Sequence, residues 1–358
     1  MSCTNQVVRF ALSDASGVTG FSVTNKVEAG AGGLLVRGCD TVGGVCCDYS
    51  GNIYVSDYKQ HCIIKIDEGG RISNFAGTPG ASGNNGTNRV ACNDASFNEP
   101  MGLACDKSNR IFVADYSNQV VRVIDSGFVS TVAGSAGNSG FVDGSGSTAR
   151  FAGPKGLDVD ASGNIYVADF GNHAVRKITA RGEVLTISGD IAGAGTGDEE
   201  NVKADKYSKQ LNTPWDVACD AEGNVYILDS GNYKIKKLTP NGWLYLHSGS
   251  GTEGTSLGDG GSLPSTCSSF TCQYGLPTSC KVDKSGNLYV IDRQEGATRL
   301  LTVNYNGEPA EIADFAGSAY VDCPIGVAVS PGQKLFVTFS DFETLVSSSS
   351  TSESSESS

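Results

Sequence analysis

One block of sequence recurs along almost the whole chain and constrains the fold more than any other feature. Its clearest copy starts at Pro154 and reads P-K-G-L-D-V-D, then G-N-I-Y-V-A-D, then N-H-A-V-R-K-I. Further copies in the same frame start at five positions: near Val42, and at Pro100, Pro214, Pro277 and Pro324. Blocks that repeat in register predict a fold assembled from repeated structural units.

Each copy predicts four short β-strands. Three apolar runs separated by glycine-rich turns are followed by a fourth, such as the run from Phe128 to Gly134. Short strands of this spacing, joined by turns rich in Gly, Asn and Asp, are typical of a propeller blade. We therefore expect an all-β fold, a six-bladed β-propeller with four-stranded blades.

The last copy is incomplete, which predicts how the ring closes. After Val346 the chain runs into serine, so the third and fourth strands of the sixth blade are missing there. Near the N-terminus, Val7-Val8-Arg9-Phe10 resembles the third-strand run Val120-Val121-Arg122-Val123. We expect N-terminal strands before about Lys26 to complete the last blade, which removes open sheet edges. The propeller then spans residues 1–346, and residues 347–358 form a Ser/Thr/Glu-rich linker or tail.

The block resembles the NHL-repeat family. The pattern P-x-G-L-x-V-D-x-x-G-N-I-Y-V-A-D-x-x-N-H covers the copy from Pro154 almost letter for letter, and the resemblance extends over residues 42–340. The spacer containing Asp143-Gly144 and Ala149-Arg150-Phe151 resembles those of extracellular, teneurin-like propellers. The resemblance implies the fold but no single activity, because such propellers include adhesion modules, sensors, RNA binders and a lyase.

Polar residues that occur in every blade are interpreted as scaffold. One aspartate precedes each Gly-Asn turn and a second ends each second strand, where their carboxylates can accept turn amides. A basic residue on the third strand is the expected partner of the second aspartate. One aromatic side chain per blade is expected to pack between neighbouring sheets. The aligned sets are Asp48, Asp106, Asp160, Asp220 and Asp283; Asp57, Asp115, Asp169, Asp229 and Asp292; Arg122, Arg176, Lys236 and Arg299; and Tyr54, Phe112, Tyr166, Tyr226, Tyr289 and Phe336.

Residues that depart from the repeat are the candidates for ligand binding. After each blade-starting proline the chain should line the mouth of the central channel, where the blades supply Met101, Lys155, Trp215, Thr278 and Ile325. The predicted ligand-binding residues are Trp215, Asp216, Asp158, Lys155 and Lys281. A tryptophan beside charged groups suits a sugar or a peptide. The alternative interpretation is that Trp215 simply fills the mouth and that backbone amides satisfy Asp158.

The 12 cysteines favour an extracellular or surface location, although no signal peptide is visible. Cys47, Cys105 and Cys219 align on the first strands and are expected to be buried small side chains. A disulfide is expected in the connection after the fourth blade, among Cys267, Cys272 and Cys280. Asn85 is the predicted glycosylation site, in an Asn85-Gly86-Thr87 loop expected to lack fixed structure.

No cofactor or catalytic set is predicted. His61, His173 and His247 lie on separate elements, and no spacing indicates a metal site. Calcium bound by the acidic loops Asp198-Glu199-Glu200 or Asp259-Gly260 is the open alternative.

The net charge and the hydropathy of the chain then limit the classes of partner. The formal net charge of -13 argues against nucleic acid, and no apolar run is long enough to span a membrane. The sequence predicts an extracellular binding or structural scaffold module for a protein or glycan partner, which can also self-assemble within a larger surface or filamentous assembly. The alternative is a secreted hydrolase or lyase with a metal-assisted site at the channel mouth. An enzyme is the less favoured of the two.

Overall fold

The computed structural model describes most of the repeat region. The described residues are 6–11, 23–27, 42–86, 88–190, 193–195, 202–203, 207–208, 211–253, 276–294, 297–303, 309–314, 323–331 and 334–340. None of the helices among these residues is long and apolar enough to cross a bilayer.

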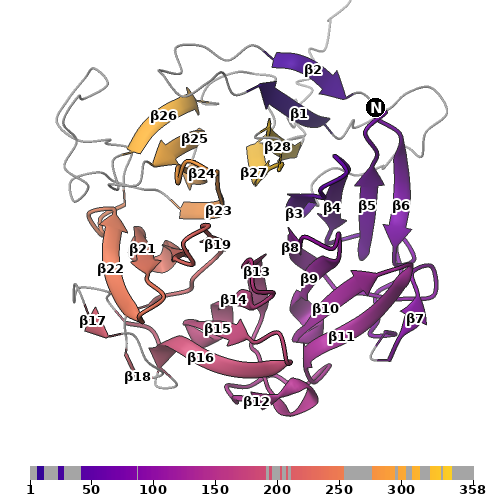
Figure 1. Ribbon diagram of the computed structural model, residues 1–358, viewed down its shortest axis with the longest axis horizontal. Coiled ribbons are helices and arrows are strands. Elements are labelled where there is room, and N and C mark those ends of the chain that lie inside the picture. Colours follow the sequence, from indigo (N-terminus) through magenta and orange to yellow (C-terminus); the bar gives the residue numbers. More distant parts are fainter. Residues whose placement is uncertain are drawn as a thin grey trace, which may run out of the picture.

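The strands form six antiparallel sheets that stand as blades in a ring, so the predicted all-β propeller is confirmed (Figure 1). The first three sheets contain β3 (Val42–Cys47), β4 (Ile53–Asp57), β5 (Cys62–Ile66) and β6 (Ile72–Ala76); β8 (Pro100–Cys105), β9 (Ile111–Asp115), β10 (Val120–Asp125), β11 (Phe128–Gly134) and β7 (Val90–Ala91); and β13 (Pro154–Val159), β14 (Ile165–Asp169), β15 (Ala174–Ile178), β16 (Glu183–Asp190), β12 (Gly144–Ser145) and β18 (Tyr207–Ser208).

The other three contain β19 (Val217–Cys219), β20 (Val225–Asp229), β21 (Lys234–Leu238), β22 (Trp243–Ser248) and β17 (Val202–Lys203); β23 (Leu276–Val282), β24 (Leu288–Gln294), β25 (Ala297–Val303) and β26 (Pro309–Asp314); and β27 (Cys323–Val329), β28 (Lys334–Ser340), β1 (Gln6–Ala11) and β2 (Val23–Val27). Short 3₁₀ turns lie at η1 (Tyr116–Asn118), η2 (Gly146–Thr148), η3 (Phe170–Asn172) and η4 (Ser230–Asn232).

The prediction of four strands in every blade is only partly correct. Three sheets have four strands, whereas the others gain short strands from the spacers: β7 pairs with β11, β12 and β18 pair with β16, and β17 pairs with β22. These strands cover the outer edges of the sheets. In the last sheet β1 pairs antiparallel with β28, with Val8 opposite Val337, and β2 pairs with β1. The two ends of the chain therefore share one blade, as Figure 1 shows at the top of the ring.

The core lies between neighbouring sheets. One cluster joins Tyr54 and Ile63 of the first blade to Leu103, Ile111 and Val113 of the second. The predicted aromatic wedges are buried at Tyr54, Phe112, Tyr166, Tyr226 and Tyr289. Their burial removes a large apolar area from water at every blade contact, which is the main stabilising contribution expected in this fold.

The aspartates before the Gly-Asn turns are structural, as predicted. Asp160 Oδ1 accepts the backbone N–H groups of Ser162 and Asn164, and its Oδ2 accepts the Asn164 side-chain amide and the Tyr166 hydroxyl. Related bonds recur at four other turns, at Asp48, Asp106, Asp220 and Asp283. The carboxylate holds the turn closed, and a metal ion is not needed to explain it.

In the second and third blades the aspartate that ends the second strand pairs with the third-strand arginine, as predicted. Asp169 Oδ2 lies 2.8 Å from Arg176 Nη1, and Asp115 Oδ2 lies 3.0 Å from Arg122 Nε. All four side chains are fully buried. Each arginine also donates to spacer carbonyls: Arg122 to Asn84 O, and Arg176 to Val142 O and Arg150 O. These buried hydrogen bonds thus attach the spacers, the segments between successive blades, to the sheets.

Each of the first three blades also holds the start of the next one. His61, Gln119 and His173 have positive φ angles of 55°, 61° and 51°, at the turn before the third strand. Their side chains accept a backbone N–H from the residue before the next blade's proline: His61 Nδ1 from Glu99, Gln119 Oε1 from Gly153, and His173 Nδ1 from Thr213. We call these three contacts the blade hooks.

The Asn85 loop has fixed structure, so the expectation of an unstructured loop was wrong as far as Asn85 and Gly86 are concerned. Asn85 Nδ2 donates to Asp94 O, and its backbone N–H donates to Ser96 Oγ. Gly86 is buried and its carbonyl accepts the Thr131 hydroxyl. The cause is the buried Arg122, which binds the adjacent Asn84 carbonyl. Asn85 itself is exposed; Thr87 lies outside the described residues.

Seven cysteines have side chains that the structure describes, and these seven are free thiols, Cys280 among them. Cys280 is fully buried on β23, where burial raises the pKa of its thiol well above the ordinary value. Cys267 and Cys272 lie outside the described residues, as do the acidic loops at 198–200 and 259–260 and the tail at 347–358. A disulfide between Cys267 and Cys272 stays a prediction.

Candidate functional site

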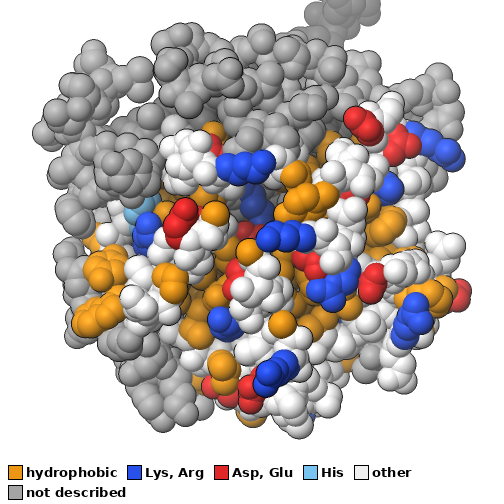
Figure 2. Space-filling view, in the orientation of Figure 1, with side chains coloured by type: hydrophobic (Ala, Val, Ile, Leu, Met, Phe, Trp, Pro, Cys, Tyr) orange, Lys and Arg blue, Asp and Glu red, His pale blue; other side chains and the backbone are white. Residues whose placement is uncertain are grey.

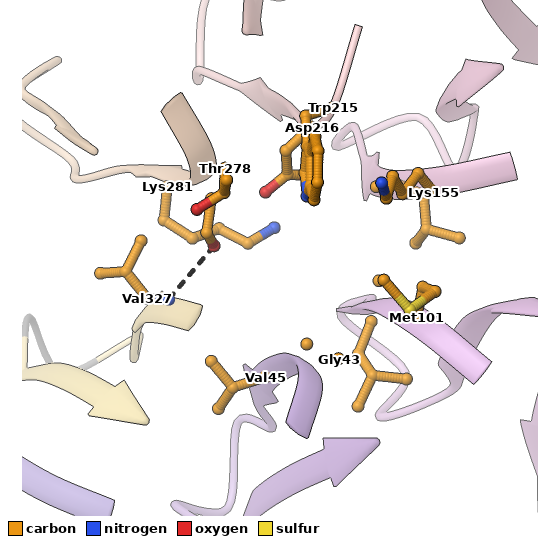
Figure 3. Close-up of a pocket in the computed structure, with 15 residues that line it drawn as sticks. Gly43, Val45, Met101, Lys155, Trp215, Asp216, Thr278, Lys281 and Val327 are labelled. Atoms are coloured by element: carbon orange, nitrogen blue, oxygen red, sulfur yellow. Dashed lines mark hydrogen bonds between the residues drawn. The ribbon is translucent and has the colours of Figure 1, made fainter. Parts of the chain in front are cut away.

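The innermost strand of each blade faces the central channel (Figure 1). Close to where these strands start, all six blades contribute to one mouth of the channel, with Gly43, Met101, Lys155, Trp215, Thr278 and Val327 among its lining residues (Figure 3). Figure 2 shows basic, acidic and apolar side chains mixed around the centre of the face turned to the reader. The predicted mouth positions are therefore brought together, except that the Ile325 side chain is not described.

Glycine lets the blades crowd around this mouth. A Cβ atom on Gly43 would lie 2.8 Å from Pro100 O, and one on Gly102 would lie 2.7 Å from Lys155 O. A Cβ on Gly156 would collide with the Asp216 carboxylate. These positions need glycine because backbone of the next blade occupies the space. The opening is consequently narrow.

Asp158 and Lys281 form an ion pair between inner strands of the third and fifth blades. Lys281 Nζ lies 2.8 Å from Asp158 Oδ1, while Asp158 Oδ2 accepts the backbone N–H of Cys219 at 2.9 Å. Burial alone would lower the pKa of Lys281, but the carboxylates of Asp158 and Asp216 outweigh it and raise that pKa. The pair links blades three, four and five, so the interpretation of Asp158 as satisfied by a backbone amide is confirmed.

Asp216 is also occupied by the scaffold. Its Oδ2 accepts the Cys280 backbone N–H at 3.0 Å, and its Oδ1 accepts the N–H of Val217 at 2.9 Å. Burial raises the pKa of Asp216 to about 7, against the opposing effect of the nearby Lys281 ammonium. The carboxylates of Asp158 and Asp216 therefore each accept a backbone N–H from the inner strand of the next blade. Neither is free to bind a ligand.

This raised pKa predicts a pH-dependent stability. The folded protein holds the Asp216 proton more tightly than the unfolded chain does, so the stabilisation is complete below about pH 4 and is lost as the pH rises through about 7. In Asp216→Asn this dependence should vanish. From about pH 5 to about pH 8 the wild-type free energy of unfolding should fall by on the order of 2 kcal/mol relative to the variant, measured by denaturant titration. Parallel pH curves for the two proteins would contradict the assignment.

Lys155 is held differently, by aromatic rings. Its Nζ lies 3.1 Å from the Trp215 ring centroid, 4.0 Å from that of Phe170 and 5.9 Å from that of Tyr116. Phe170 also packs edge-on against Trp215, with centroids 5.6 Å apart. We call these four residues the lysine cage. Cation–π contacts of this kind stabilise and orient an ammonium group without neutralising it.

The lysine cage contains no carboxylate. Among the described residues Lys155 makes no ion pair and no hydrogen bond through its amine. Burial, and then the positive charge of Arg293, lower the pKa of Lys155 to about 7. Thr278, also at this mouth, has a buried Oγ1 with no hydrogen-bond partner in the described part of the chain. The mouth thus has polar groups that the scaffold leaves unused.

The structure divides the five predicted ligand-binding residues into two sets. Asp158, Asp216 and Lys281 belong to the links between blades, whereas Lys155 and Trp215 face the opening (Figure 3). Sequence reasoning did not select Phe170, Tyr116 or Arg293. A signal existed for all three, because each directly follows one of the aspartates predicted to end a second strand.

The described residues of the other mouth of the channel form no cluster suited to a metal ion. This mouth is lined by the ends of the inner strands, with Cys47, Cys105 and Cys219, and by turn aspartates such as Asp160. Burial raises the pKa of each of these three thiols. Across the described ranges no group of three or more His, Cys, Asp or Glu side chains is placed to hold a metal ion.

Comparison with known proteins agrees with this architecture. The family profile described as NHL repeat matches residues 151–178. The chain is 33% identical over 234 residues to Protein SUPPRESSOR OF QUENCHING 1, chloroplastic, of Arabidopsis thaliana, covering 62% of this chain and 21% of that protein. It is 30% identical over 184 residues to human NHL repeat-containing protein 2, covering 47% of this chain and 24% of that protein. The chain therefore spans about a fifth to a quarter of these relatives.

Among solved structures, a gluconolactonase from Xanthomonas campestris matches with a TM-score of 0.54 at 12% identity, covering 84% of this chain and 86% of that one. At this identity the similarity establishes the fold alone.

Proposed function

Because the chain is an NHL-repeat β-propeller, we propose that it is a binding module that holds a protein or glycan partner at the channel mouth beside Lys155 and Trp215. The observation that carries this proposal is the lysine cage. Every other charged group described at the mouth on an inner strand is used to join blades, while the Lys155 ammonium is fixed by rings and has no anionic partner among the residues that the structure describes.

Binding suits these groups better than catalysis does. An enzyme needs a nucleophile, a base or a metal within reach of one another. At this mouth the carboxylates of Asp158 and Asp216 already accept backbone amides, and Lys281 is paired. The hydrolase or lyase alternative predicts a stoichiometric, tightly held transition metal in the purified protein, which elemental analysis can detect.

The experiment compares the two tryptophans. Trp215 lines the mouth, whereas Trp243 lies on outer strand β22 with 42% of its surface exposed. Purified protein is screened against an array of defined glycans and by cross-linking to candidate proteins. Binding found for the wild type should weaken at least about tenfold in Trp215→Ala, the scale of a lost aromatic anchor, and persist in Trp243→Ala. The reverse result would place the contact on the outer strands. A turnover activity abolished by Trp215→Ala would overturn the binding-only proposal.

We also propose that the module works outside the cell or at its surface, within a larger assembly. The support is the sequence alone: 12 cysteines and the Ser/Thr/Glu-rich tail at 347–358. Asn85 provides the test, because its side chain is exposed. Mass spectrometry of material secreted by a eukaryotic cell should find an N-linked glycan on Asn85. Unmodified Asn85 in such material would argue against export through a glycosylating pathway.

A further inference from the structure

The Lys155 amine is already in position, it is mostly charged below about pH 7, and a bound anion would favour its charged form. Three rings surround it, and Nζ lies 3.1 Å from the Trp215 centroid. Holding a flexible lysine in place before the ligand arrives reduces the entropy that binding costs. A charge fixed in this way, with no described carboxylate beside it, favours an anionic ligand group.

The other charges near this amine also favour an anionic ligand group. Arg293 is close enough for its charge to act on Lys155, and it too has no ion pair among the described residues. Lys281 contributes a third positive charge, offset by Asp158 and Asp216. The net charge of -13 repels large acidic partners at long range, but salt screens that field beyond about 8 Å. The local charge therefore favours one small anion over a polyanion.

Thr278 supplies a second, neutral anchor. Its Oγ1 is buried at the mouth with no hydrogen-bond partner in the described ranges, which costs free energy unless a ligand or water completes the bond. Thr278 and Lys155 lie on opposite sides of Trp215 in Figure 3. A ligand that reaches both needs an anionic group and a separate hydrogen-bonding group, which a sugar hydroxyl can supply.

The shape of the mouth restricts the ligand further. Close backbone contacts at Gly43 and Gly102 keep the opening narrow. One face of Trp215 is already covered by the Lys155 amine, so a sugar would be recognised there by charge and hydrogen bonds and not by stacking on that face. Resting on the proposed function, we infer that the mouth binds an acidic sugar, with the carboxylate on Lys155 and a hydroxyl on Thr278.

Tryptophan fluorescence provides a direct test. The chain has 2 tryptophans, so the Trp243→Phe protein keeps Trp215 as its single reporter at the site. This full-length protein is titrated with glucuronate and with glucose, which lacks the carboxylate. We expect a saturable fluorescence change with glucuronate and none with glucose. A glucuronate-terminated oligosaccharide, run in parallel, distinguishes a free acid from the end of a glycan.

Matched variants assign the contacts. Lys155→Met keeps the length of the side chain and should weaken glucuronate binding about tenfold or more, as for loss of a charge-assisted bond. Thr278→Val should weaken it several-fold. Lys107→Met makes the same charge change at an exposed residue of the opposite mouth and should leave binding unchanged. Thermal unfolding of each variant checks that the fold is intact.

Three results would overturn the inference. Glucuronate could bind no better than glucose, or binding could survive Lys155→Met in a folded protein. Alternatively, a peptide with a single glutamate could bind, and its glutamine version not, while neither acidic sugar binds. If a partner of the wild type requires Trp215 but not Lys155, the inference about acidic sugars fails while the proposed binding function stands.

Discussion

Replacing Arg176 by methionine is expected to destabilise the protein by about 3–5 kcal/mol, because it leaves the buried Asp169 carboxylate without its cation. Both side chains are fully buried and lie 2.8 Å apart. The same guanidinium also binds Asp143 Oδ1 and the carbonyls of Val142 and Arg150, so the spacer before blade three should loosen as well. Denaturant unfolding monitored by circular dichroism measures the loss.

Two controls separate the buried charge from other effects. Arg181→Met makes the same substitution at an exposed turn and should change stability by less than about 0.5 kcal/mol. Adding Asp169→Asn to Arg176→Met should recover part of the loss, because the uncompensated charge is then removed. Equal stability of Arg176→Met and wild type would show that the pair contributes nothing.

Removing residues 1–27 is expected to abolish cooperative folding of the monomer or to drive it into dimers. The deletion takes away β1 and β2, which are two of the four strands in their sheet. It also uncovers the edge of β28, where six residues pair with β1. An uncovered edge of this kind can pair with the same edge of another molecule.

The measurement is thermal unfolding combined with light scattering of the eluted species. A deletion of the Ser/Thr/Glu-rich tail at 347–358 serves as the control and should leave both readouts unchanged, since such a segment has little apolar surface to bury. A monomeric truncated protein with the wild-type melting temperature would show that the N-terminal strands are dispensable.

The repeated frame made most of the fold predictable. The buried aromatic residues, the turn aspartates and the Arg122 and Arg176 pairs follow from positions that align in every copy. The two-residue spacer strands β7, β12, β17 and β18 were missed because a strand so short has no periodicity to read. Their pairing depends on where the ring places the outer strands.

The candidate site was only half predictable for a similar reason. The departures of Lys155, Trp215 and Asp216 from the repeat are visible in the sequence. The sequence does not reveal that Asp216 accepts the amide of Cys280, 64 residues later, or that Asp158 meets Lys281, 123 residues later. Those contacts arise from closing the ring, which brings distant inner strands together. A charged residue at the mouth could therefore be either a link or a ligand group, and only the structure separates Lys155 from Asp158.

The blade hooks have a consequence for how such rings can diversify. His61, Gln119 and His173 each accept a main-chain N–H, so none of them reads the side chain of the residue it holds. The acceptor belongs to one blade and the donor to the backbone of the next, so the hydrogen bond does not depend on the donor's side chain, although each donor, Glu99, Gly153 or Thr213, must adopt a left-handed φ. Spacer sequences can therefore be exchanged or lengthened between blades while the angle of each junction is preserved. Surface loops of very different composition can be displayed on one ring in this way, provided that each junction keeps an acceptor side chain at its left-handed turn.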